Sequence, residues 1–166
     1  MRDQGPVSGD AHQPAGDEQR LYRIARGDLS AATGQTPGMT RVQAIAGQTV
    51  GSSALWMGQT HVAPATRSAD HHHGKSETGI YVVSGAPVFV FFDGTEEVSL
   101  ETQPGDYIYV PPWVPHREEN PDPDQEAVVV IARTTQEAIV VNLPSLRPVT
   151  RAWAAGPRVS RDWHTY

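Results

Sequence analysis

The chain has 166 residues, of which 38% are hydrophobic and 19% charged, a composition typical of a folded globular domain. Nineteen acidic against thirteen basic residues give a net charge of −6, which argues against affinity for a phosphate backbone and therefore against a nucleic-acid partner. The sequence has no cysteine, so disulfides and thiolate metal sites are excluded, and any transition metal must be bound by imidazole and carboxylate groups.

The two ends of the chain differ from its middle. Residues 1–19 have almost no large apolar side chains and are predicted to be a disordered segment. Residues 20–146 are expected to form one domain, and residues 147–166 form a tail that either frays or docks on the domain or on a second subunit. No apolar stretch approaches the 18 residues of a membrane span, and no signal peptide is recognisable, so a cytoplasmic protein without membrane contact is expected.

Short β-rich segments follow one another through the middle of the chain, with turn residues between them. The predicted strands are 54–62, 80–84, 86–92, 97–102, 106–110, 127–133 and 138–143. Asp93-Gly94 between two of them is a strong hairpin signal. No segment of a dozen residues repeats its apolar side chains with the period of a helix. The fold class is therefore all-β, a sandwich or a closed barrel.

The first candidate for chemistry is the run of three histidines followed by Glu77. Residues two apart on an extended chain point to the same face, so His71 and His73 are expected to converge while His72 points away. Glu77 follows after a short turn and is expected to return a carboxylate to the same point. Imidazole and carboxylate together suit a divalent transition metal. A register with His72 as a ligand in place of a neighbour is the alternative.

The second candidate is the segment from Gly105 to Asn120. A predicted strand rises there to a turn stiffened by prolines, including Pro111 and Pro115, because proline fixes φ. The next strand begins by presenting His116, which is therefore expected to be a rigidly mounted metal ligand.

These two segments resemble the paired motifs of the cupin superfamily. The first family motif, G-x5-H-x-H-x3/4-E-x6-G, is matched at His71, His73, Glu77 and Gly85, with seven residues instead of six before the last glycine and without the leading glycine. The resemblance implies a double-stranded β-helix, also called a jelly-roll barrel.

The second family motif, G-x5-P-x-G-x2-H-x3-N, is matched at Gly105, Pro111, His116 and Asn120. Trp113 stands where the motif has glycine, and we expect it to cap the mouth of the barrel. What the resemblance implies for the site is one divalent metal (Zn, Fe, Mn, Ni or Cu) with open positions for a substrate.

The predicted ligand set is His71, His73, Glu77 and His116. Aromatic and polar side chains of the predicted strands are candidates for the pocket lining, although strand alternation turns about half of them outward. These candidates are Trp56, Met57, His61, Tyr81, Phe89, Phe91, Tyr107, Tyr109, Trp113 and Arg133.

Three functions stay open. The resemblance favours an enzyme that acts on a small metal-chelating metabolite, with dioxygenase chemistry first and isomerase or lyase chemistry possible. Residues 71–85 and 105–120 also look like the zinc cupin domains of hydrazine-forming synthetases, which join nitrogen to nitrogen in natural-product biosynthesis; here that reaction needs a partner enzyme. A non-catalytic module that binds a small molecule is the third. Cupins often pair, so a homodimer is expected.

Overall fold

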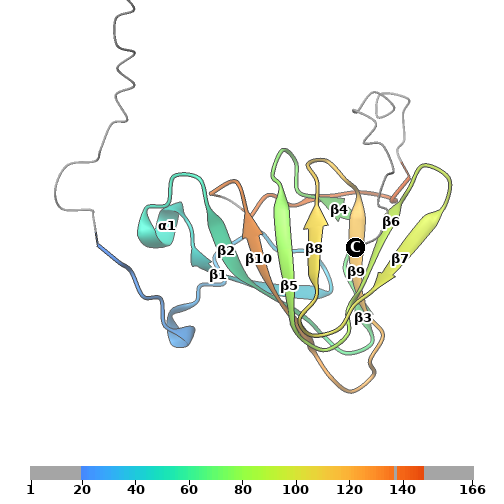
Figure 1. Cartoon of the computed structure of the whole chain (residues 1–166), viewed down its shortest axis with the longest axis horizontal. Helices are drawn as coiled ribbons and strands as arrows, with labels where there is room; N and C mark the ends of the chain where they lie inside the picture. The colour runs from blue at the N-terminus through green and yellow to red at the C-terminus, as the bar shows by residue number, and fades with distance from the viewer. Residues whose placement is uncertain (1–19, 137, 148–166) are drawn as a thin grey trace, which may run out of the picture.

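Two antiparallel sheets packed face to face make up the computed structural model, which describes residues 20–136 and 138–147 (Figure 1). The predicted all-β fold class is confirmed. The predicted N-terminal segment and all but the first residue of the predicted tail lie outside the described residues. No helix in the described part of the chain is long and apolar enough to cross a membrane.

The first sheet has the strand order β1-β2-β10-β5-β8. Its strands are β1 (Met39–Ile45), β2 (Trp56–Val62), β5 (Thr78–Ser84), β8 (Tyr107–Val110) and β10 (Ala127–Arg133). The second sheet has the order β11-β4-β9-β6-β7, and β3 pairs with β9 beside this path. Its strands are β3 (Thr66–Arg67), β4 (His71–His72), β6 (Val88–Phe92), β7 (Glu97–Glu101), β9 (His116–Asn120) and β11 (Val141–Asn142). The helical elements of the described residues are η1 (Arg26–Asp28) and α1 (Gly47–Val50).

Each predicted strand is present, although the last one is shorter than predicted, since only Val141–Asn142 pairs within the segment 138–143. Strand β1 was not among the predictions. Its inward side chains are Met39, Arg41 and Gln43, so two of the three are polar. A strand is recognised in a sequence by alternating apolar residues, and β1 lacks that alternation because it turns polar side chains into the protein.

The space between the sheets is partly apolar and partly polar. Strand alternation points Trp56, Ile80 and Ile131 inward from three adjacent strands of the first sheet, and they join one buried apolar cluster. The second sheet contributes polar side chains to the same interior, because His116, Glu118 and Asn120 occupy the inward positions of β9. The core therefore provides the apolar packing that stabilises the fold, while β9 and its neighbours provide groups for chemistry.

The predicted turn at Gly85, which closes the first cupin motif, adopts a conformation that favours glycine. Its φ is +76°, and a Cβ at this position would lie 2.8 Å from the Cα of Ala127. A larger residue would therefore strain the backbone and collide with β10.

Candidate metal centre

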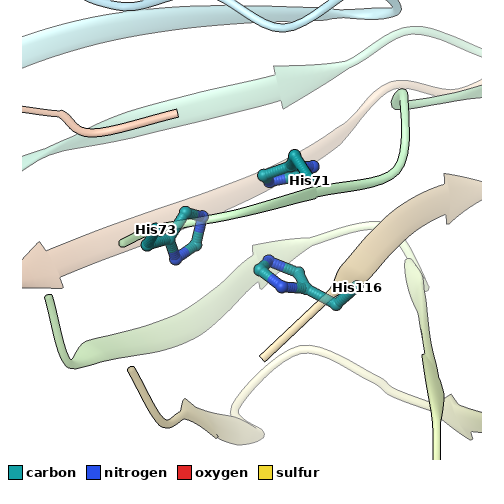
Figure 2. Close-up of side chains that lie close together, drawn as sticks. All are labelled: His71, His73 and His116. Atoms are coloured by element: carbon teal, nitrogen blue, oxygen red, sulfur yellow. The ribbon is translucent and has the colours of Figure 1, made fainter. Parts of the chain in front are cut away.

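Three histidines from two distant segments of the sequence lie together between the sheets. Figure 2 shows the side chains of His71, His73 and His116 converging on one another. One ring nitrogen from each lies within 4.8 Å of the others, and the ring centroids are 4.5–5.2 Å apart. The Cα atoms of His71 on β4 and His116 on β9 are direct cross-strand partners. All three side chains are buried, with 3% or less of their surface exposed.

Hydrogen bonds orient the three rings. The Nδ1 atom of His71 lies 2.8 Å from the carbonyl oxygen of Ala69, and that of His116 lies 2.9 Å from the carbonyl of Val114. A carbonyl oxygen only accepts, so both Nδ1 atoms must carry the proton, and both Nε2 atoms then carry a lone pair. The Nδ1 atom of His73 is 2.8 Å from the hydroxyl of Thr78.

The Nε2 atoms of the three rings are buried and have no hydrogen-bond partner among the described residues. An unpaired buried polar atom is costly, so three of them at one place require an explanation. A metal ion bound by the three lone pairs provides one, because imidazole nitrogens suit divalent transition metals and carbonyl-bound Nδ1 atoms are the usual support of such ligands. These residues therefore fit the metal that the sequence implies.

The environment also keeps the imidazoles neutral, as metal binding requires. Burial, with a contribution from His116, lowers the pKa of His71 to about 2. Burial likewise lowers the pKa of His116 to about 4. Burial and the positive charge of Arg133 hold the pKa of His73 well below its ordinary value. All three rings are unprotonated at neutral pH.

The predicted fourth ligand, Glu77, does not join this cluster. Its side chain is exposed, and its Oε1 accepts a hydrogen bond of 2.9 Å from the hydroxyl of Tyr109. The backbone explains the difference: the N–H of Glu77 donates to the Thr134 hydroxyl, which fixes Glu77 before β5 begins. The inward position is taken by Thr78 instead, which is fully buried.

The spacing of the first cupin motif already favours Thr78 over Glu77 at the inward position. The first cupin motif allows three or four residues between the second histidine and the acid, followed by six before the glycine. Counting four residues after His73 and six before Gly85 leads to Thr78 and not to Glu77. Thr78 therefore occupies the motif's acidic position, and its hydroxyl meets the ring of His73.

The alternative register through His72 is not realised. The Nδ1 atom of His72 accepts a hydrogen bond of 2.9 Å from the N–H of Gly74, and its ring meets the edge of Trp113 at a centroid distance of 5.5 Å. Trp113 adopts the glycine-like conformation of the motif, with φ of +65°, and its N–H donates to the carbonyl of Gly74. Half exposed, it covers His72 rather than the interior.

The predicted pocket lining divides as strand alternation requires. Trp56, Phe89 and Arg133 are buried between the sheets. His61 points outward from β2 and pairs with Glu126 at 2.8 Å. Phe91 and Tyr109 border the apolar groove described below. The remaining candidates are exposed or only partly buried: Met57, Tyr81, Tyr107 and Trp113.

Two charged interior residues were missed by the sequence reasoning. Arg41 on β1 and Glu118 on β9 are both buried, with 1% or less of their surface exposed. The two-residue period of a strand could have predicted that Glu118 points inward, because it follows His116 by two residues on the same face of β9. Arg41 gave no comparable signal, since β1 itself was not recognised.

An apolar groove reaches the cluster from one side. It has a volume of about 600 Å³ and runs between the edge strand β8 and strands β6 and β7. Phe89, Phe91, Leu100 and Val114 line it, and His116 lies at its wall. Because its lining is apolar and includes His116, the groove offers a small molecule a route toward the cluster.

The comparisons with known proteins agree with this architecture. The family model described as "Cupin domain" matches residues 58–132. Among curated proteins, none matches the sequence significantly. The solved structures that resemble the chain share at most 23% of its sequence in the cases described next, so they inform on the fold alone.

A polyketide cyclase from Streptomyces resistomycificus has 23% identity and a TM-score of 0.61, over 75% of this chain and 86% of its own. An uncharacterised protein with a double-stranded β-helix domain from Klebsiella pneumoniae has 16% identity and a TM-score of 0.54, over 69% and 92%. Oxalate decarboxylase from Lactobacillus farciminis, in a formate complex, has 21% identity and a TM-score of 0.63, over 84% of this chain and 41% of its own. The paired motifs, the two-sheet fold and the matching family model thus agree on a cupin domain over residues 58–132.

Proposed function

We propose that this protein is a metal-dependent cupin enzyme that holds one divalent transition-metal ion through His71, His73 and His116 and acts on a small metabolite. The proposal rests on one observation above all: three buried Nε2 atoms without partners among the described residues, on rings whose neutral state is enforced by burial. Three protein ligands leave room for water or a chelating substrate, which is the arrangement typical of catalytic rather than structural metal sites.

When bound, such an ion supplies Lewis-acid chemistry to a chelated substrate, and a redox-active ion also supplies electron transfer toward O2. The protein's own residues hold and shield the site. The carbonyls of Ala69 and Val114 and the hydroxyl of Thr78 fix the ring orientations, so the ligand geometry is preorganised. The apolar groove beside His116 provides space for an organic molecule next to the cluster.

Oxygenase chemistry on a metal-chelating metabolite is the reaction class we favour, with isomerase and lyase chemistry as variants of the same site. The likeness to hydrazine-forming zinc cupins is not shown by the comparisons, and a biosynthetic partner enzyme remains part of that alternative only. A non-catalytic binding protein would use the same ligands and groove. The identity of the metal separates these readings, because oxygenase chemistry needs a redox-active ion whereas the hydrazine-forming cupins use zinc.

The test begins with elemental analysis of protein purified without chelators. Metal-free protein is then reloaded with Fe, Mn, Ni, Cu or Zn, and O2 consumption is recorded with a panel of chelating metabolites. Metal-dependent turnover supports the enzyme. Saturable binding of unchanged ligand with every metal would favour the binding protein, and failure of the wild-type protein to retain any divalent ion would refute the proposal.

We also propose a cytoplasmic homodimer. Its contact surface is the outer face of β5 and β8, where Tyr81, Val83, Tyr107 and Tyr109 are exposed and the rings of Tyr81 and Tyr107 lie 4.9 Å apart. Aromatic side chains are enriched in protein interfaces and favour burial. Sedimentation equilibrium of the full chain and of Tyr107→Glu tests this surface; a monomeric wild-type protein would contradict it.

A further inference from the structure

Two arginines inside the fold each leave one edge of the guanidinium group unused. Arg41 and Arg133 are buried, with 0% and 1% of their surface exposed. Nη1 of Arg41 donates to the carbonyl of Gly34, and Nη1 of Arg133 donates to the carbonyl of Ile139 at 3.0 Å. The Nε and Nη2 atoms of both residues are buried and have no hydrogen-bond partner within residues 20–136 and 138–147.

The nitrogen atoms without a hydrogen-bond partner are the same two in both arginines, and together they suit one kind of ligand. Nε and Nη2 lie on one edge of the planar guanidinium group and direct two parallel N–H bonds outward, a fork that fits the two oxygens of a carboxylate. Leaving four such donors unpaired in the interior is costly. A ligand with a planar oxyanion removes that cost.

The fold holds the forks in place before any ligand arrives. The guanidinium carbon of Arg133 lies 5.5 Å from the ring centre of Trp56, and the indole N–H of Trp56 donates to Oε1 of Gln43 at 3.3 Å. The backbone of Arg41 is bound at both its N–H and its carbonyl by the amide of Gln35. Preorganised donors lose little entropy when a ligand binds, so their fixed positions favour a ligand-binding site.

The charges of the interior do not balance without an anion. Glu118 is the buried carboxylate whose charge acts on both arginines, and one carboxylate cannot neutralise two guanidinium groups. No ion pair among the described residues joins Glu118 to Arg41 or Arg133. A divalent ion on three neutral imidazoles adds further positive charge, and unpaired buried charge is unfavourable.

The forks and the histidine cluster share one interior. The Cα of Arg133 on β10 is the cross-strand partner of the Cα of Thr78 on β5, and the Thr78 hydroxyl contacts the ring of His73. Both arginines act electrostatically on His71 and on His73. A small molecule that contacts a fork is therefore close to the cluster.

We infer that the substrate of this site is a small carboxylic acid whose carboxylate is bound by the fork of Arg133, assisted by Arg41, while another part of the molecule faces the three histidines. This inference rests on the proposed function, because the bound acid is a substrate only if the protein is an enzyme. The anion site itself consists of residues that are not metal ligands, so it is testable on metal-free protein.

The experiment measures carboxylate binding to the full chain, metal-free and zinc-loaded, by thermal shift and titration calorimetry in a buffer without carboxylates at fixed ionic strength. The probes are acetate and benzoate, each compared with its neutral amide. We expect saturable stabilisation by the carboxylates and none by the amides, in both forms of the protein. Arg133→Lys keeps the charge and removes the fork, so it should weaken binding tenfold or more. Arg67→Lys, which alters an exposed arginine, is the matched control and should have no effect.

Equal effects of carboxylate and amide, or no effect of either, would overturn the inference. Binding that needs zinc and is unchanged in Arg133→Lys would also overturn it, because the carboxylate would then be a metal ligand only; the proposed metal site would survive. Binding of carboxylates by a protein that never retains metal would support the anion site and refute the proposed function. If Arg133→Lys does not fold, Arg41→Lys and the comparison of carboxylate with amide on the wild-type protein decide the question.

Discussion

Acidification of the metal-free protein should remove several kcal/mol of stability within a narrow pH range. The three cluster histidines are buried and neutral in the folded state, and their pKa values are lowered, to about 4 for His116 and about 2 for His71. In the unfolded chain the same side chains titrate near their ordinary value of about 6.5. Between these values the unfolded state binds protons that the folded state does not, so stability falls as the pH falls from about 6.5 toward 4.

The magnitude follows from the number of rings. At pH 5.5, one unit below the ordinary pKa, each neutral buried imidazole costs about 1.4 kcal/mol, so the three together cost about 4 kcal/mol. That is a large share of the roughly 5–15 kcal/mol that stabilises a typical domain. With a urea dependence of about 2 kcal/mol per molar, the unfolding midpoint should drop by about 2 M between pH 7.5 and 5.5. Most carboxylates titrate below this range and contribute little.

The assay is urea denaturation in the presence of EDTA at several pH values, followed by tryptophan fluorescence. His116→Asn should reduce the pH dependence by about one third, whatever it does to the stability at pH 7.5, because one of three rings is removed. His72→Asn should leave most of the dependence intact, since that ring is only partly buried. A free energy of unfolding that is constant within about 1 kcal/mol from pH 7.5 to 5.5 would show that the three rings are not held neutral by burial, as would an unchanged slope in His116→Asn.

Three substitutions test other parts of the structure. Trp113→Gly should stabilise the metal-free fold by up to about 1 kcal/mol or leave it unchanged, because φ of +65° is strained for tryptophan; a clear loss in urea denaturation would contradict the strain. Gly85→Ala should cost more than about 1 kcal/mol in the same assay, since its Cβ would lie 2.8 Å from Ala127, and an alanine variant of wild-type stability would disprove that collision. Thr78→Val removes the hydroxyl that orients His73 and should weaken metal binding about 10–100-fold in competition with a chelator, whereas Thr78→Ser should not; equal affinity in both variants would exclude a positioning role.

The sequence allowed the histidine cluster to be predicted because its geometry is local. His71 and His73 share a face through the two-residue period of extended chain, and the proline-bounded turn presents His116 to the same space. Motif spacing linked the two segments across more than forty residues, and the structure brings their side chains together.

Glu77 shows where the same reasoning failed. One residue of register reverses the direction of a side chain at a strand, and the turn between His73 and β5 sets that register. Residue type favoured Glu77 as a ligand, but the spacing to Gly85 favoured Thr78, and the backbone followed the spacing. Register near a turn depends on the neighbouring strand, here on the contact of Glu77 with Thr134.

Of the two arginines that we infer to bind an anion, Arg41 was missed by sequence analysis for a different reason. Arg133 was a pocket candidate, whereas Arg41 lies on a strand whose inward residues are largely polar. Hydrophobic alternation identifies strands that face an apolar core, so a strand that serves a polar interior is overlooked. Arg41 therefore lies on a strand that lacks the apolar alternation by which strands are recognised.

The most direct test of the metal centre is the metal content of the purified protein and its variants, measured by elemental analysis and by titration with zinc. We expect about one divalent ion per wild-type chain, the same content in His72→Asn and Glu77→Gln, and a steep loss in His116→Ala and in His71→Ala. A loss of metal in Glu77→Gln as large as in His116→Ala, or a wild-type protein that binds no divalent ion, would contradict this expectation.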